Sequence, residues 1–224
     1  MAFRVRDHEV INNDGHPTMF GHQEKIASVQ IGHQVWMAEN LRVKYYSNGD
    51  PIPTGYSNSE WKNLSTDAYA VYDNDPINET VYGLLYNWYA VNNAAGLAPE
   101  GWHVPSNEEF DTLEPYLGSL DALGANEGSK LAGNHDLWID TTLEYNLENN
   151  SEFGTSGFNG LPAGYRQYTT GGFKSLGGNG NFWSSTENSP NARYSRLQSN
   201  SSKLWRIGAG NKQSGYSIRC IKDT

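Results

Sequence analysis

The sequence is poor in cysteine, in hydrophobic residues and in charged residues. Cys220 is the only cysteine, so an internal disulfide is excluded and packing must stabilise the fold. Hydrophobic residues make up 37% of the chain, and no apolar run approaches the ~20 residues that a membrane-spanning helix needs. The first residues alternate charged and apolar side chains and lack the continuous apolar stretch of a secretion signal. We therefore expect neither a membrane span nor a signal peptide in this chain.

Positive charge and reactive motifs are scarce as well. The chain has 16 Lys and Arg residues against 25 Asp and Glu residues, and its net charge of −9 argues against nucleic-acid binding. The six histidines show no short spacing typical of zinc ligands. We find no nucleophile elbow, phosphate loop or dinucleotide fingerprint. Cys220 shares a predicted strand face with Tyr216 and Ile218, which indicates a small buried side chain rather than a catalytic thiol. These patterns predict a protein that is not an enzyme.

Glycine and aromatic residues are abundant instead. The chain contains 24 Gly, 14 Tyr and 7 Trp, together with many Asn, Ser and Thr. Gly and Asn cost helix stability and favour turns, so this mixture predicts a loop-rich fold of short strands. We expect an N-terminal arm over residues 1–27, with a hairpin turn at Asn13-Asp14-Gly15, and one main domain over residues 28–224.

Within the main domain, the pattern predicts strands on both sides of Gly32 and a long surface loop over residues 52–80 that ends in a short strand near Ala70. Two helices are expected. The first has apolar residues at 84, 85, 88 and 91 on one face. The second starts at a capping box of Ser106 and Glu109 and ends at Gly118.

Six sequence blocks carry a resemblance to a known family. They cover residues 29–41, 82–90, 101–106, 157–166, 182–187 and 215–220. Together, and in this order, they resemble the Fibrobacter succinogenes major paralogous domain family, which also occurs in Bacteroidetes. The resemblance implies an α+β fold of the C-type-lectin-like and formylglycine-generating-enzyme type, with a twisted antiparallel sheet, about two helices and long loops. It also implies a cell-surface or extracellular protein of unknown ligand.

A second resemblance concerns residues 191–211. Variable proteins of diversity-generating retroelements use the same lectin-like fold and vary near the C-terminus, at positions that adenine mutagenesis reaches from Asn codons. The segment is rich in Asn, Ser, Arg, Tyr and Gly and fits this pattern in part, because Leu204 and Trp205 are not one-step adenine products. The resemblance implies a recognition surface here, on a bacterial or phage-virion protein.

The residue types of this segment are those of binding surfaces. Tyr, Trp and Arg provide large contact areas, and Ser, Gly and Asn provide adaptable hydrogen bonds. We predict that the segment faces outward and binds a protein or a glycan, without a signal for oligomeric state. The candidate ligand-binding residues are Arg193, Tyr194, Arg196, Gln198, Asn200, Trp205, Arg206 and Asn211. In the alternative interpretation Tyr194, Leu197, Leu204 and Trp205 pack in the sheet, as Trp183 is expected to do.

Other functions stay open at this point. A glycan hydrolase with dispersed carboxylates and a structural surface or virion component are the alternatives to a binding protein. No cofactor is expected. Ca²⁺ is the one metal with candidate ligands, because Asp73, Asp75 and Glu79 cluster oxygen donors, although their spacing does not match an EF-hand.

Overall fold

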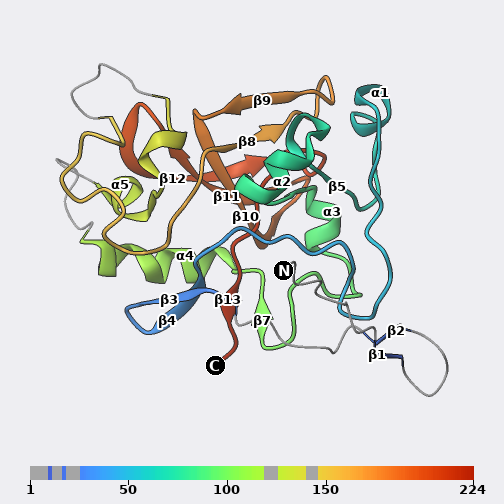
Figure 1. Ribbon diagram of the computed structural model, residues 1–224, viewed down its shortest axis with the longest axis horizontal. Helices are drawn as coiled ribbons and strands as arrows, with labels where there is room; N and C mark the ends of the chain where they lie inside the picture. Colours follow the sequence, from blue (N-terminus) through green and yellow to red (C-terminus); the bar gives the residue numbers. More distant parts are fainter. Residues whose placement is uncertain (1–9, 12–16, 19–25, 119–125, 140–145) are drawn as a thin grey trace, which may run out of the picture.

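Five strands near the C-terminus form the main sheet of the computed structural model, which describes residues 10–11, 17–18, 26–118, 126–139 and 146–224 (Figure 1). The strand order is β12-β11-β10-β8-β9. These strands are β8 (Ala163–Arg166), β9 (Phe173–Leu176), β10 (Asn179–Asn188), β11 (Asn191–Gln198) and β12 (Ser201–Gly210). All neighbours are antiparallel except β8 and β10, which meet in parallel at Gly164 and Gly180. Strands β11 and β12 cover residues 191–210 of the predicted recognition segment and form a long meander with β10.

A second sheet joins the start of the main domain to its end. Its order is β3-β4-β13-β7, from β3 (Ser28–Ile31), β4 (Gln34–Met37), β7 (Trp102–His103) and β13 (Ile221–Lys222). The predicted strands around Gly32 are confirmed, and Gly32 itself adopts φ +60 at the turn. The two sheets connect through residues 215–218, because Ser217 exchanges backbone hydrogen bonds with Asn181 and Trp183 of β10.

The remaining elements are short. The small strand pairs are β1 (Val10–Ile11) with β2 (Pro17–Thr18) and β5 (Tyr69–Ala70) with β6 (Leu85–Tyr86). The helices are α1 (Asn58–Trp61), α2 (Pro76–Tyr82), α3 (Trp88–Val91), α4 (Asn107–Leu113) and α5 (Glu127–Leu131), with 3₁₀ turns η1 (Tyr72–Asn74), η2 (Glu114–Leu117) and η3 (His135–Leu137). Strands β1 and β2 flank the predicted arm turn, whose residues 13–15 lie outside the described residues.

The helix predictions were right at α4 and wrong in three other respects. Ser106 and Glu109 form the expected capping box, and Gly118 ends η2 in the left-handed conformation. The described residues contain five α-helices rather than two. Residues 52–80 are not one long loop, because capping at Ser57 and Asp75 starts α1 and α2 within them. The apolar residues before Trp88 form strand β6 instead of a helical face, since the backbone of Tyr86 pairs with Tyr216.

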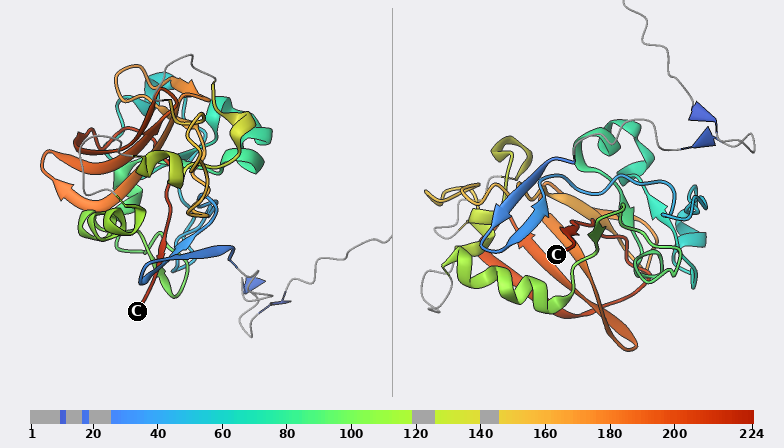
Figure 2. Two further views of the ribbon diagram at one scale, coloured as in Figure 1. Left: turned by 90° about the vertical axis from the view of Figure 1, so that its left-hand side faces the viewer. Right: turned by 90° about the horizontal axis from the view of Figure 1, so that it is seen from below.

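The β10–β11–β12 meander packs two different cores on its two faces. Phe182 and Leu197 point to one face, which we call the helix face, and contact a cluster that includes Phe110 of α4 and Leu131 of α5. Figure 2 shows α4 alongside these strands. The alternate positions, including Trp183, point to the opposite face, which we call the aromatic face, and belong to a second cluster. This alternation decides which side chains of the segment can reach a ligand.

Candidate ligand-binding surface

Tyr194 is buried, so the prediction that it faces outward is wrong. Its exposed fraction is 6%, and its ring centroid lies 5.8 Å from that of Trp183 and 4.6 Å from that of Tyr216. Trp183 is fully buried, as predicted. Tyr194 is a core residue because period-2 alternation places it opposite Trp183, on the covered part of the aromatic face.

Arg206 also serves the scaffold rather than a surface. It pairs with Ser195 and points to the helix face. Its guanidinium lies 2.8 Å from an Asp111 carboxylate oxygen and 2.9 Å from one of Glu114, and it donates to the backbone and side-chain oxygens of Asn107. It also covers the Phe110 ring at 5.3 Å. These contacts fasten β12 to α4 and η2, which corrects its prediction as a ligand contact.

Trp205 and Arg196 remain as an exposed pair on the aromatic face. Trp205 lies on edge strand β12 with 45% of its surface exposed, directly across from half-buried Arg196 on β11. Arg196 donates from Nε to the Asn181 side-chain oxygen at 2.9 Å and from Nη2 to the Tyr194 hydroxyl. The guanidinium is therefore held by residues of the buried core, and its backbone position lies directly across from that of Trp205.

The other candidates divide by position. Gln198 follows Arg196 on the same side of β11 and is half-buried, and Asn200 is exposed in the β11–β12 turn. Arg193 alternates to the opposite face from Arg196. Asn211 is half-buried and accepts the backbone N–H of Gln213, as a turn residue does.

Two residues of this surface were missed by sequence reasoning. Asn181 is 1% exposed and orients Arg196, and Lys203 is exposed two residues before Trp205 on the same strand. The signal was available as the period-2 alternation that links Asn181 to Trp183 and Lys203 to Trp205. We define the Trp205 surface as Arg196, Gln198, Lys203 and Trp205, together with Asn181, which is buried beneath Arg196 and orients it.

The structure gives the candidate calcium ligands other contacts. Asp75 caps α2 by accepting the Ile77 N–H, and Glu79 forms an ion pair with Lys44 at 2.7 Å. Asp73 lies in η1 with φ 52. In the described part of the chain, no group of three or more His, Cys, Asp or Glu residues is arranged to hold a metal ion. The three candidates are thus not brought together as a ligand set.

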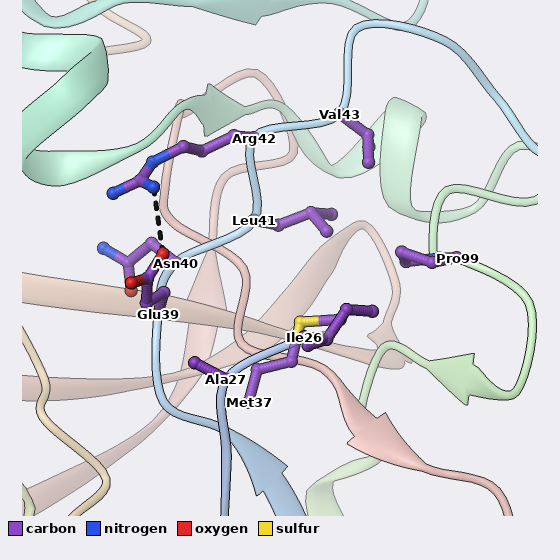
Figure 3. Close-up of a pocket in the computed structure, with 9 residues that line it drawn as sticks. All are labelled: Ile26, Ala27, Met37, Glu39, Asn40, Leu41, Arg42, Val43 and Pro99. Atoms are coloured by element: carbon purple, nitrogen blue, oxygen red, sulfur yellow. Dashed lines mark hydrogen bonds and ion pairs between the residues drawn. The ribbon is translucent and has the colours of Figure 1, made fainter. Parts of the chain in front are cut away.

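A hollow elsewhere on the molecule is the second candidate site. It has a volume of about 450 Å³ and adjoins another of about 690 Å³ that shares Arg42, Val43 and Pro99. Leu41, Val43, Ile26 and Pro99 point toward one another across it, whereas Arg42 points away to an ion pair with Glu39 (Figure 3). Because this ion pair and that of Lys44 with Glu79 occupy the nearby charges, the hollow has fewer free polar groups to orient a ligand than the Trp205 surface.

Comparison with known proteins gives a family. A model described as the Fibrobacter succinogenes major domain matches residues 29–222. The chain belongs to this family. No curated protein and no solved structure matches the chain. No helix in the described ranges is long and apolar enough to cross a membrane.

The Fibrobacter succinogenes major domain spans both sheets, and three of the blocks that suggested the family meet at the buried Arg219. Arg219 is fully buried and donates to the backbone oxygens of Met37 and Asn159 at 3.1 Å each, and to Phe158. Arg166 lies between the rings of Trp61 and Phe173, at 4.3 and 4.8 Å. Burial lowers the pKa of Arg166 to about 10 and that of Arg219 to about 9. These blocks build the scaffold that presents the Trp205 surface.

Proposed function

We propose that this protein is a non-catalytic, C-type-lectin-like binding protein that recognises a glycan through the Trp205 surface. The single observation behind the proposal is that the exposed Trp205 is the cross-strand neighbour of Arg196, whose guanidinium is held by the core. The apolar face of a sugar ring stacks on an exposed indole, and fixed polar donors beside it bind hydroxyl groups. The proposed location is a cell surface, the extracellular space or a phage virion.

The size of the Trp205 surface favours a glycan over a protein ligand. A standard protein interface buries about 800 Å² on each partner and centres on several apolar or aromatic anchors. The Trp205 surface offers one aromatic side chain surrounded by polar ones, which matches the footprint of a few sugar rings. The rigid backing by Tyr194 and Trp183 adds preorganisation, because little side-chain freedom is lost when a ligand binds.

A C-type-lectin-like fold agrees with how the chain is connected. Strand β13 at the end of the family domain pairs with β4 at its start, and long hairpins and irregular loops lie between them. The resemblance of the sequence blocks to that fold adds the second support. A loop-rich fold of this kind carries recognition residues on a rigid sheet without needing a reactive group.

A glycan array with the full chain, followed by a hydrolysis assay on every glycan that binds, tests the proposal. We expect binding without turnover, and turnover would instead establish the hydrolase alternative. Trp205→Ala should abolish binding, whereas Tyr45→Ala, which removes another exposed aromatic side chain on a different segment, should leave it unchanged. Since Asp75 and Glu79 have other contacts, EDTA should not weaken binding. Binding lost with EDTA and restored by Ca²⁺ would contradict the assignment of the site.

A further inference from the structure

Arg196 lacks an acidic partner, unlike Arg42 and Arg206. Arg42 pairs with Glu39 at 2.9 Å, and Arg206 pairs with Asp111 at 2.8 Å. Among the described residues, no carboxylate oxygen lies within 4.0 Å of the Arg196 guanidinium. Its assigned partners are the amide oxygen of Asn181 and the hydroxyl of Tyr194, and both are neutral. These acceptors fix its direction and leave its charge uncompensated.

Burial makes this uncompensated charge informative. Arg196 is half-buried against residues that are 1% and 6% exposed, so part of its hydration is lost on folding. A charge that loses water is normally paired, because desolvation costs free energy that only a partner offsets. The buried side-chain nitrogen of Asn181 also has no partner among the described residues. Arg196 is therefore the partly exposed donor at this place, and exposed Lys203 adds a second cation on the same strand as Trp205.

We infer that the glycan is acidic, and that its carboxylate binds Arg196 while its pyranose ring stacks on Trp205. This inference rests on the proposed function. In an oligosaccharide of uronic acids each ring carries its own carboxylate, so one ligand can extend from the indole on β12 to the guanidinium, which is directed toward Asn181 of β10. Charge-assisted bonds from a guanidinium to a carboxylate are among the strongest hydrogen bonds in proteins. The net charge of −9 repels an anion at long range, so short-range contacts must supply the selectivity.

The decisive experiment compares matched ligands by titration calorimetry on the full chain. Oligosaccharides of galacturonate, glucuronate and mannuronate are set against their carboxyl-reduced counterparts, which are the neutral sugars of the same linkage. We expect at least one acidic member to bind about tenfold or more tightly than its neutral partner. Arg196→Gln should remove this preference and Arg196→Lys should keep part of it, while Arg42→Gln serves as the matched control and should change nothing.

The outcomes separate this inference from the proposed function. If the neutral and acidic members bind equally, the acidic class is wrong and glycan recognition stands. If no member of the panel and no glycan on the array binds, both are wrong. If polyglutamate binds with a dependence on Arg196 but none on Trp205, the ligand is an acidic peptide and the glycan class fails. Thermal melts of each variant check folding, and the exposed Trp205→Ala provides a second readout that does not disturb the Arg196 hydrogen bonds.

Discussion

At the scale of single residues, aromatic side chains on two adjacent strands have opposite roles. Tyr194 of β11 packs against Trp183 and Tyr216, whereas Trp205 of β12 is 45% exposed across from Arg196. We expect Tyr194→Ala to lower the free energy of unfolding by about 3–5 kcal/mol, as for other buried aromatic residues. Trp205→Ala should lower it by less than about 1 kcal/mol. Urea denaturation of both variants checks this, and similar losses would show that Trp205 belongs to the core.

The residue composition pointed to this segment as a candidate surface but could not sort its members. Aromatic and Arg enrichment marks both binding surfaces and well-packed cores, and Tyr194 and Arg206 proved to be packing residues. The sorting depends on which residue faces which neighbour, and that register includes shifts near Ala192 and Arg196 that no local pattern reveals. Cys220 was simpler, because an apolar strand pattern sufficed to predict that it is buried.

At the scale of elements, Arg206 couples helix α4 to strand β12. Its side chain is 18% exposed and contacts Asp111, Glu114 and Asn107. Arg206→Ala should lower the free energy of unfolding by about 1–3 kcal/mol, because several charge-assisted hydrogen bonds are lost while the freed carboxylates regain water. The more exposed pair of Arg42 and Glu39 is the control, and Arg42→Ala should cost about 0.5 kcal/mol. The ligand affinity of the folded variant should not change. A large loss of affinity would show that Arg206 belongs to the binding surface.

His103 links three elements through two carboxylates. Its ring nitrogens lie 2.7 Å from Asp223, which follows β13, and 2.8 Å from Glu109 of α4. Desolvation alone would lower the pKa of His103, but its hydrogen bonds to Asp223 and Glu109 outweigh this and raise it above 6.5. Folding therefore favours the protonated ring, and this stabilisation is complete below the unfolded pKa of 6.5 and is lost as pH rises through the folded value.

A pair of thermal melting series tests this linkage. The difference in Tm between the native protein and His103→Gln should be largest at about pH 6 and shrink toward about pH 9, because Gln cannot carry the charge. A difference that stays constant over this range would mean that the ring acts by packing alone. The sequence predicted the helix whose capping box contains Glu109. It did not reveal the contact between His103 and Asp223, because these residues are 120 positions apart in the chain.

Elements were predictable where their signals are local and self-contained. The α4 capping box and the Gly32 turn depend on a few adjacent residues, and both were predicted. Strand β6 was read as part of a helix because its apolar spacing suits either structure, and its pairing with β5 and with Tyr216 decides the outcome. The capping signals of α1 and α2 were present at Ser57 and Asp75 but were outweighed by the polar, proline-containing composition around them.

At the scale of the whole molecule, most of the chain forms a scaffold that supports the small Trp205 surface. Buried arginines connect distant loops by donating to backbone oxygens. The two cores pack on the two faces of the β10–β11–β12 meander. Gly210 shows how little freedom the covered part has, because a Cβ there would lie 2.6 Å from the Trp183 ring. The expectation that residues 191–211 face outward is therefore wrong for the buried positions of the segment, which are Ala192, Tyr194, Ser195, Leu197, Ser199, Ser202 and Gly210.

This division makes the retroelement hypothesis specific. If the segment is diversified, functional variants can change only where the scaffold tolerates change, which is at Arg196, Gln198, Asn200, Lys203 and Trp205. Ala192, Tyr194, Leu197 and Gly210 should stay constant, since each is buried in a core or against one. Sequencing the source genome should reveal a neighbouring reverse transcriptase and a near-copy of the 3′ coding segment differing at adenines. Differences spread equally over the buried positions would argue against diversification, because most of the encoded proteins would then lose the core that holds Arg196 in place.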